Sequence, residues 1–285
     1  MVLKVALPDT SLIDCTDLRQ KTVKVGQIAR TFAIFRVGEV LVYNTGKLRP
    51  SQKRDADFLM KILRFMDTPQ YLRRRVFPRS PSLQYAGLLP PLRTRSHPLQ
   101  SKMAELTVGT VRWGIQVRPG KVDLGFDNLI DFPATLSERD PTLFKVEATV
   151  PHLSLSVINR SEVPVYWGFE VSRINDLLDF LKNSIAVTRV GFSRKAPPFQ
   201  KLEDDLKSTV FNTGSVVAVF GGPDRGILEL CDSQREEIKR HIDFWANTID
   251  DQGSETVRLE EALIVSLGLV NNAVGKTITK PGFYE

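Results

Sequence analysis

Short apolar runs alternate with segments of helical periodicity at both ends of the chain, and this alternation predicts a parallel α/β sheet. The apolar runs have the length of buried strands and are bounded by turn residues. They lie at residues 2–7, 39–43, 185–190 and 216–220. Apolar residues repeat at helical spacing in residues 18–32, 53–65, 171–183 and 258–270, and a short charged helix begins at Lys201. The order strand, helix, strand predicts helices on both faces of the sheet.

The middle of the chain has a different pattern. Prolines interrupt a basic connector that begins near Pro69, and short β-rich runs then continue to about residue 164. The candidate strands are residues 106–111, 115–117, 122–126, 143–150 and 153–157, with a hairpin turn at residues 118–121. Their spacing suits a small barrel. The pattern therefore allows either two domains or one α/β domain, formed by residues 1–91 and 165–285, with a β-barrel inserted at residues 92–164.

The inserted segment carries four aromatic side chains with two alternative uses. Trp113, Phe126, Phe132 and Phe144 have rings of the kind that stack on the bases of single-stranded nucleic acid. In a domain this small, aromatic side chains fill the core more often than they form a stacking platform.

The predicted helix at residues 258–270 is apolar on more than one side. One stripe at helical spacing comprises Leu259, Ala262, Leu263, Ser266, Leu267 and Val270. Ile264, Val265 and Leu269 lie off that stripe. A helix of this kind is buried by its own domain and by a partner subunit as well. The tail from residue 275 to residue 285 shows no clear pattern.

Three predicted strands lead into loops that contain glycine and polar residues. These loops lie at residues 191–195, 221–226 and 247–257. Ligands of α/β sheets bind outside the carboxyl ends of the strands, where such loops meet. Two nucleotide-binding motifs are excluded: the chain has no GxGxxG, and Gly275-Lys276-Thr277 lacks the P-loop glycine because position 270 is Val.

Positive charge is concentrated in one segment. The net charge is +6, but residues 47–95 contain twelve Lys and Arg against three acidic residues, whereas the remainder carries 27 basic and 30 acidic residues. Such a segment is typical of a surface that binds a polyanion, although a basic stretch is often only a solvated face.

Other features bound the class of protein. No run of about 18 apolar residues is present, and the apolar start is too short for a signal peptide, so we expect a cytoplasmic protein without a membrane span. Cys15 and Cys231 are the only cysteines and His97, His152 and His241 are scattered, which favours two reduced thiols and no metal site.

Several stretches together resemble the SPOUT methyltransferases, and more closely their RNA methyltransferase branch of archaea and eukaryotes. The stretches are FGGPDRG at residues 220–226, NTI at 247–249, QGSETVRLEEA at 252–262, KVGQIAR at 24–30, TPQYLR at 68–73, LQYAGLL at 83–89 and YWGF at 166–169. They span nearly the whole chain in order, so no single short motif carries the resemblance.

The resemblance implies a fold and a cofactor. The fold is a trefoil knot in an α/β domain built from both ends of the chain, with an OB-fold-like insert, acting as a homodimer. The cofactor is S-adenosylmethionine, held largely by backbone groups that glycine allows to approach closely. The expected cofactor-binding residues are Gly222, Asn247, Thr248, Ile249, Gly253, Val257 and Leu259.

The resemblance also implies the catalytic and RNA-binding positions. Relatives carry Ser-Glu-Arg-Gly where this chain has Ser193-Arg194-Lys195-Ala196, so the catalytic cation is expected at Arg194 or Lys195. Secondary candidates are Asp224, Arg225, Glu255 and Glu260, with a buried structural pairing as the alternative for Glu260. The arginines expected to contact the RNA backbone are Arg73, Arg74, Arg75, Arg79, Arg93 and Arg95.

These features together favour an S-adenosylmethionine-dependent RNA methyltransferase that modifies a base nitrogen, with ribosomal RNA a more probable substrate than tRNA. One alternative is a non-catalytic RNA-binding or ribosome-assembly factor that keeps the knot fold. Another is a small-molecule methyltransferase, which leaves the basic segment unexplained.

Overall fold

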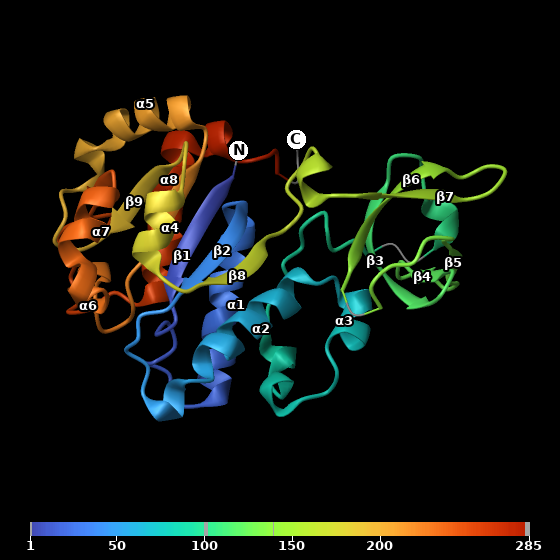
Figure 1. Cartoon of the computed structure of the whole chain (residues 1–285), viewed down its shortest axis with the longest axis horizontal. Helices are drawn as coiled ribbons and strands as arrows, with labels where there is room; N and C mark the ends of the chain where they lie inside the picture. The colour runs from blue at the N-terminus through green and yellow to red at the C-terminus, as the bar shows by residue number, and fades with distance from the viewer. Residues whose placement is uncertain (1, 100–101, 139, 283–285) are drawn as a thin grey trace.

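A six-stranded parallel sheet forms the centre of the larger domain, in the order β11-β9-β10-β1-β2-β8 (Figure 1). The computed structural model describes residues 2–99, 102–138 and 140–282. The strands are β1 (Leu3–Pro8), β2 (Val37–Tyr43), β8 (Glu170–Ile174), β9 (Thr188–Phe192), β10 (Val216–Val219) and β11 (Phe244–Ala246). All neighbouring strands pair in parallel, which confirms the predicted α/β architecture.

Helices cover both faces of this sheet. The helices of one face are α1 (Leu18–Ile34), α2 (Asp55–Asp67), α5 (Glu203–Thr213) and α8 (Leu259–Ile278), and those of the other are α4 (Leu177–Asn183), α6 (Ile227–Leu230) and α7 (Arg235–His241). Along β1 the side chains alternate between the two cores: Val5 and Leu7 pack with the first set, and Ala6 packs with the second. Two hydrophobic cores thus hold the sheet in place.

The prediction of one helix over residues 171–183 is wrong. This segment forms the edge strand β8, then a break, then helix α4. Val171, Ile174, Leu177 and Leu181 satisfy helical spacing, but β8 pairs with β2 from Glu170 to Ile174, and sheet pairing overrides the local pattern. Asp176 begins α4 by accepting a hydrogen bond from the Asp179 backbone N–H at 2.8 Å.

Other boundaries also differ from the sequence prediction. Strand β9 begins at Thr188, and Ile185, expected to be buried, is 87% exposed. Helix α8 continues to Ile278, well beyond residue 270, because Val274 and Ile278 still pack on the core. The pattern missed α3 (Gln70–Val76), α6 and α7, which are short helices of one or two turns.

The inserted segment forms a five-stranded antiparallel sheet in the order β5-β4-β3-β6-β7. Its strands are β3 (Val111–Arg118), β4 (Lys121–Asp123), β5 (Ile130–Asp131), β6 (Thr142–Ala148) and β7 (Ser154–Ile158). The strand expected at residues 106–111 is wrong, because residues 106–110 form a loop and turn, whereas the one expected at residues 115–117 lies within β3. The hairpin turn at residues 118–121 is confirmed. Phe132 and Phe144 are buried in the core of the insert and meet edge to face, which supports the core interpretation of these aromatic residues.

Polar contacts fix the insert to the larger domain. Asp67 at the end of α2 accepts hydrogen bonds from the guanidinium of Arg160 at 2.8 Å and from the backbone N–H of Phe169 at 2.9 Å.

Tyr71 on α3 donates to the carbonyl oxygen of Trp113 at 2.8 Å, and Arg75 pairs with Asp123 at 2.5 Å. Helix α3 therefore connects the inserted sheet to the larger domain.

Gly168 lies at this junction, and we expect its replacement by alanine to destabilise the protein. Its φ is +88°, and a Cβ there would lie 2.0 Å from Oδ1 of Asp67. Gly120 has a similar φ of +76° with nothing within 4 Å of an added Cβ, which makes it a matched control. Urea denaturation should show a loss of roughly 3 kcal/mol for Gly168→Ala and about 1 kcal/mol for Gly120→Ala. Equal losses in the free energy of unfolding would show that the steric contact with Asp67 does not contribute to the destabilisation.

Candidate active site

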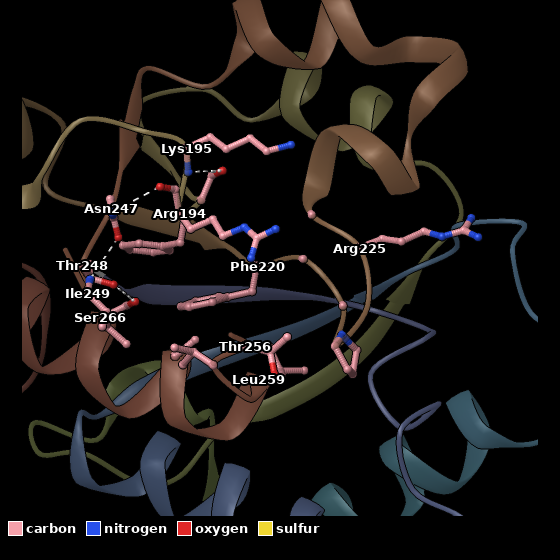
Figure 2. A pocket seen from close by; sticks show the side chains of 18 of the residues that line it. Arg194, Lys195, Phe220, Arg225, Asn247, Thr248, Ile249, Thr256, Leu259 and Ser266 are labelled. Carbon is pink, nitrogen blue, oxygen red and sulfur yellow. Dashed lines mark hydrogen bonds between the residues drawn. The ribbon is translucent and has the colours of Figure 1, made fainter. Parts of the chain in front are cut away.

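Three loops converge at the carboxyl ends of β9, β10 and β11 and enclose a cavity of about 270 Å³ (Figure 2). They are residues 193–198, 220–226 and 247–257, and the first turns of α8 form the remaining wall. Because the carboxyl ends of parallel strands lie at one end of the sheet, the sequence predicts that these loops meet. The structure places them around a single cavity.

The backbone of Asn247 holds the loops together. Its N–H donates to the carbonyl oxygen of Pro197, and its carbonyl oxygen accepts from the N–H of Phe199, both at 2.8 Å. Its side chain donates to the carbonyl oxygen of Arg194 at 3.3 Å and accepts from the N–H of Ile249 at 3.1 Å. Asn247 thus joins the loop after β9 to the loop after β11.

Most of the expected cofactor-binding residues line this cavity. Those in its wall are Gly222, Asn247, Thr248, Ile249, Val257 and Leu259. Gly253 is not among them: it lies in the same loop as Val257, outside the wall. A Cβ on Gly222 would meet Oγ1 of Thr10 at 3.0 Å and Leu230 at 3.5 Å, so this glycine provides close packing behind the loop.

The apolar side chains that line the bottom of the cavity, here called the apolar floor, were not predicted as part of the site from the sequence. Phe220 is 2% exposed and stacks on Phe192 with ring centroids 4.7 Å apart. Ala262 and Ser266, one and two turns beyond Leu259, extend this floor along α8, and Ser266 shares a hydrogen bond of 2.7 Å with Thr248. The i, i+3, i+7 spacing of these α8 residues was the available signal, but it also fits an ordinary core stripe.

Two cations lie at the cavity. Figure 2 shows the guanidinium of Arg194 inside it, beside Phe220, and Arg194 donates to the carbonyl oxygen of Glu255 at 3.3 Å. Lys195 crosses the rim and pairs with Glu229 at 3.1 Å, and this hydrogen bond holds the pKa of Glu229 below its usual value. Arg225 comes from the opposite loop, and its guanidinium points away from the cavity.

The residues present suit an adenosyl cofactor. The floor is apolar, as an adenine ring requires. Backbone donors are also available: within the described part of the chain, the N–H groups of Gly221 and Thr248 have no hydrogen-bond partner. A buried or half-buried N–H without a partner favours a ligand that accepts from it. The donors come from two different loops, so one ligand can contact both.

Comparison with known proteins places the chain in a family. Residues 2–270 match the family model described as "Putative RNA methyltransferase". The chain belongs to this family. An uncharacterized protein of Halobacterium salinarum is 30% identical over 94% of this chain and 98% of its own length. The 28S rRNA (uridine-N(3))-methyltransferase of Mus musculus is 27% identical over 98% of this chain and 78% of its own length, and the human protein of that name is 28% identical over 93% and 76%.

Membership of the RNA methyltransferase family favours the enzyme hypothesis over a non-catalytic RNA-binding factor. Lys24, in one of the stretches that carried the resemblance, is buried and has a structural role. Lys24 is 4% exposed and lies between Asp14 at 2.7 Å and Glu260 at 3.2 Å. Because Glu260 is in the first turn of α8, this pairing fixes the turn that presents Leu259 to the cavity.

The arginines expected to bind RNA have different surroundings. Arg73 donates to the carbonyl oxygens of Thr68 at 2.9 Å and Met66 at 3.1 Å and lies over the ring of Phe65, and burial lowers its pKa to about 10. Its guanidinium is therefore committed to the fold, and we remove it from the proposed RNA surface. The guanidinium of Arg75 forms an ion pair with Asp123. Four other arginine side chains are exposed: Arg74, Arg79, Arg93 and Arg95.

The remaining chemistry is structural. Cys15 and Cys231 are free thiols, as expected, and burial raises the pKa of each to about 11. Within the described residues no three His, Cys, Asp or Glu side chains lie close enough to bind a metal ion together. None of the described helices combines the length and the apolar character needed to cross a lipid bilayer.

Proposed function

We propose that this chain transfers a methyl group from S-adenosylmethionine to N3 of a uridine in the RNA of the large ribosomal subunit. The observation that carries the proposal is the cavity at the carboxyl ends of β9, β10 and β11, which combines an apolar floor, free backbone donors and Arg194. The family match supports RNA as the substrate, and the names of the mouse and human relatives support the uridine.

The loops around the cavity would hold the cofactor. Phe220, Leu259 and Ala262 would contact its adenine, and the N–H groups of Gly221 and Thr248 would donate to its polar atoms. When bound, the cofactor supplies an electrophilic methyl group, which bonds to the uridine nitrogen as its bond to sulfur breaks. By excluding water and fixing the two reactants in line, the cavity lowers the entropic barrier.

Arg194 would stabilise the uracil ring as it loses its N3 proton. Deprotonation places negative charge on N3 and the two carbonyl oxygens, and a fixed guanidinium in a partly enclosed cavity offsets that charge. Lys195 is 73% exposed at the rim, where the proton passes to water. Because Lys195 keeps the pKa of Glu229 low, Glu229 is a poor proton acceptor, and we assign it the role of holding Lys195.

The path of the chain supports a knot. From β11 at the sheet edge, residues 247–258 run alongside the connection between β9 and α5, with which Asn247 shares two backbone hydrogen bonds. The chain then continues into α8, which packs beside α1 and α5 on the opposite face from α7. We propose that this crossing is the trefoil knot of the SPOUT fold.

The insert would bind RNA as an OB-fold-like barrel. Strand β3 pairs with β6 through residues 111–114 and with β4 through residues 115–118, so one bent strand joins two halves of the sheet. This pairing supports our proposal of a partly open Greek-key barrel, a fold that binds oligonucleotides. Arg74 and Arg79, together with Arg93 and Arg95, would contact the RNA backbone near its junction with the larger domain.

An exposed apolar strip on α1 and α8 supports a homodimer. Val23 on α1 is 38% exposed, and Ile264 and Val265 on α8 are 45% and 37% exposed. Both helices pack on the same hydrophobic core, and exposed apolar side chains on helices of this kind favour an interface with a partner subunit. Sedimentation velocity of the purified chain should show a dimer, and a monomer at micromolar concentration would reject this assignment.

Cofactor binding tests the site directly. Ala262 is small, half-buried and directed into the cavity, so Ala262→Trp should fill the adenine position. Isothermal titration of S-adenosylmethionine into the wild type should give a micromolar dissociation constant, and the variant should bind at least about 30-fold more weakly, roughly 2 kcal/mol. Asn272→Trp, at an exposed position farther along α8, is the matched control. Absence of binding by a folded wild type would reject the proposed enzyme.

Catalysis tests the role of Arg194. With an unmodified transcript of large-subunit ribosomal RNA as substrate, Arg194→Ala should lower kcat by about 10²-fold, the usual loss when one charge-stabilising group is removed. Cofactor affinity should change by less than about threefold. Arg225→Ala is the control, because that guanidinium points away from the cavity (Figure 2). Mass spectrometry of digested RNA identifies 3-methyluridine, and an equal loss in both variants would contradict the assignment.

A further inference from the structure

A second cavity, of about 550 Å³, is lined by the first two turns of α1 and of α2 and by residues 81–82. Because α1 and α2 follow the carboxyl ends of β1 and β2, this cavity lies at the same end of the parallel sheet as the candidate active site. Lys21 on α1 pairs with Asp55 on α2 at 2.7 Å. One turn further along α1, Lys24 pairs with Glu260, the neighbour of Leu259 in the active-site wall.

Asp55 carries an acceptor that the fold does not use. Its side chain is 8% exposed and lines the second cavity. Oδ1 accepts a hydrogen bond from the ammonium of Lys21, whereas Oδ2 is buried and has no hydrogen-bond partner among the described residues. A buried carboxylate oxygen without a partner destabilises the fold, so its presence favours a ligand that donates to it. Lys21 fixes the carboxylate in advance, which reduces the entropy lost on binding.

The other acidic side chains of this wall have structural partners. Asp17 caps α1 by accepting from the backbone N–H of Gln20 at 2.8 Å. Asp57 pairs with Arg173 at 2.7 Å. Among the described residues of the wall, the unused carboxylate acceptor is therefore the one on Asp55.

The rest of the wall suits a nucleobase and its phosphate. Leu18, Phe58 and Pro81 supply apolar surface, against which the flat face of a base can pack. Lys61 donates to two serine hydroxyl groups at 2.7 and 2.8 Å, which hold its ammonium in place. Arg54 is exposed, and its guanidinium has no partner among the described residues, so it is available to a phosphate.

We infer that the second cavity binds a guanine base of the RNA substrate and that Asp55 selects this base. The inference rests on the proposed function. Guanine presents two adjacent donors on its Watson–Crick edge, N1–H and the N2 amino group, and one carboxylate accepts from both. Uracil, adenine and cytosine each place an acceptor atom next to their donor, and the negative carboxylate repels that acceptor.

The position of the cavity favours RNA over a free guanine nucleotide. Arg54, Lys61 and Pro81 belong to residues 47–95, the segment that carries the excess of positive charge. The active-site cavity lies at the same end of the sheet. One strand of RNA can therefore place a uridine in the active site and a nearby guanosine in the second cavity, where bases of an unpaired strand are read by their edges.

The first test needs no variant. Fluorescein-labelled 12-nucleotide RNAs are compared by anisotropy: an oligouridylate with one central guanosine, and the same strand with inosine, adenosine or uridine at that position. The wild type should bind the guanosine strand about 10-fold more tightly than the adenosine and uridine strands, because these lose hydrogen bonds to a charged group. Inosine lacks only the N2 amino group and should give an intermediate affinity. Equal affinity for all four strands would overturn the inference.

Asp55→Asn tests the residue itself. Asparagine keeps an oxygen for Lys21 but replaces the other acceptor with an NH₂ donor, which opposes the donors of guanine. The folded variant, checked by its thermal midpoint, should bind the guanosine and inosine strands within about twofold of each other. Asp57→Asn removes an equal charge from the same turn of α2 and should keep the full preference. A guanosine preference that persists in Asp55→Asn would contradict the role of Asp55.

Two further titrations separate the alternatives. Asp55→Asn should bind S-adenosylmethionine as the wild type does, and absence of cofactor binding by the wild type would reject the proposed enzyme without removing a measured guanosine preference. Guanosine 5′-monophosphate alone should bind the wild type much more weakly than the guanosine strand does. Micromolar binding of this nucleotide that is lost in Asp55→Asn, with no guanosine preference in RNA, would overturn the inference and assign the cavity to a free nucleotide.

Discussion

The two backbone hydrogen bonds of Asn247 are the constraint on which the candidate site depends. They join the loop after β11 to the loop after β9, although the two loops are some fifty residues apart in the sequence. Together with the side-chain hydrogen bond from Asn247 to the carbonyl oxygen of Arg194, they hold the loop that carries Thr248 and Ile249 beside the loop of Arg194. The same contact links two of the loops that enclose the cavity, and it lies where we propose the trefoil knot.

A second constraint acts from beneath the cavity. Lys24 is buried between Asp14 and Glu260, and it therefore fixes the first turn of α8 against α1. That turn carries Leu259, and the next one carries Ala262, so the position of the apolar floor depends on a charge pairing that lies outside the cavity. Buried charges of this kind contribute little net stability but fix one arrangement of the elements.

The arginines of the basic segment divide between stability and binding. Arg73 is packed on Phe65 and saturated by backbone carbonyl groups, so its charge serves the junction between α2 and α3. Arg74 and Arg79, in the same segment, are exposed and are among the residues proposed to contact RNA. A count of positive charges along the sequence does not separate these roles, because the separation depends on which carbonyl groups lie nearby.

The sequence by itself determined the parallel sheet, the two-sided helical cover, the β-rich insert and the loops that form the cavity. Apolar runs, turn residues and chain order carry that information locally. Only the tertiary structure decided that residues 170–174 form an edge strand, that α8 continues to Ile278, that Gly222 faces Thr10 and that Gly253 lies outside the wall. In each case the deciding partner is distant in the sequence: β2 for the strand, the core for the helix, and the packing of neighbouring loops for the glycines.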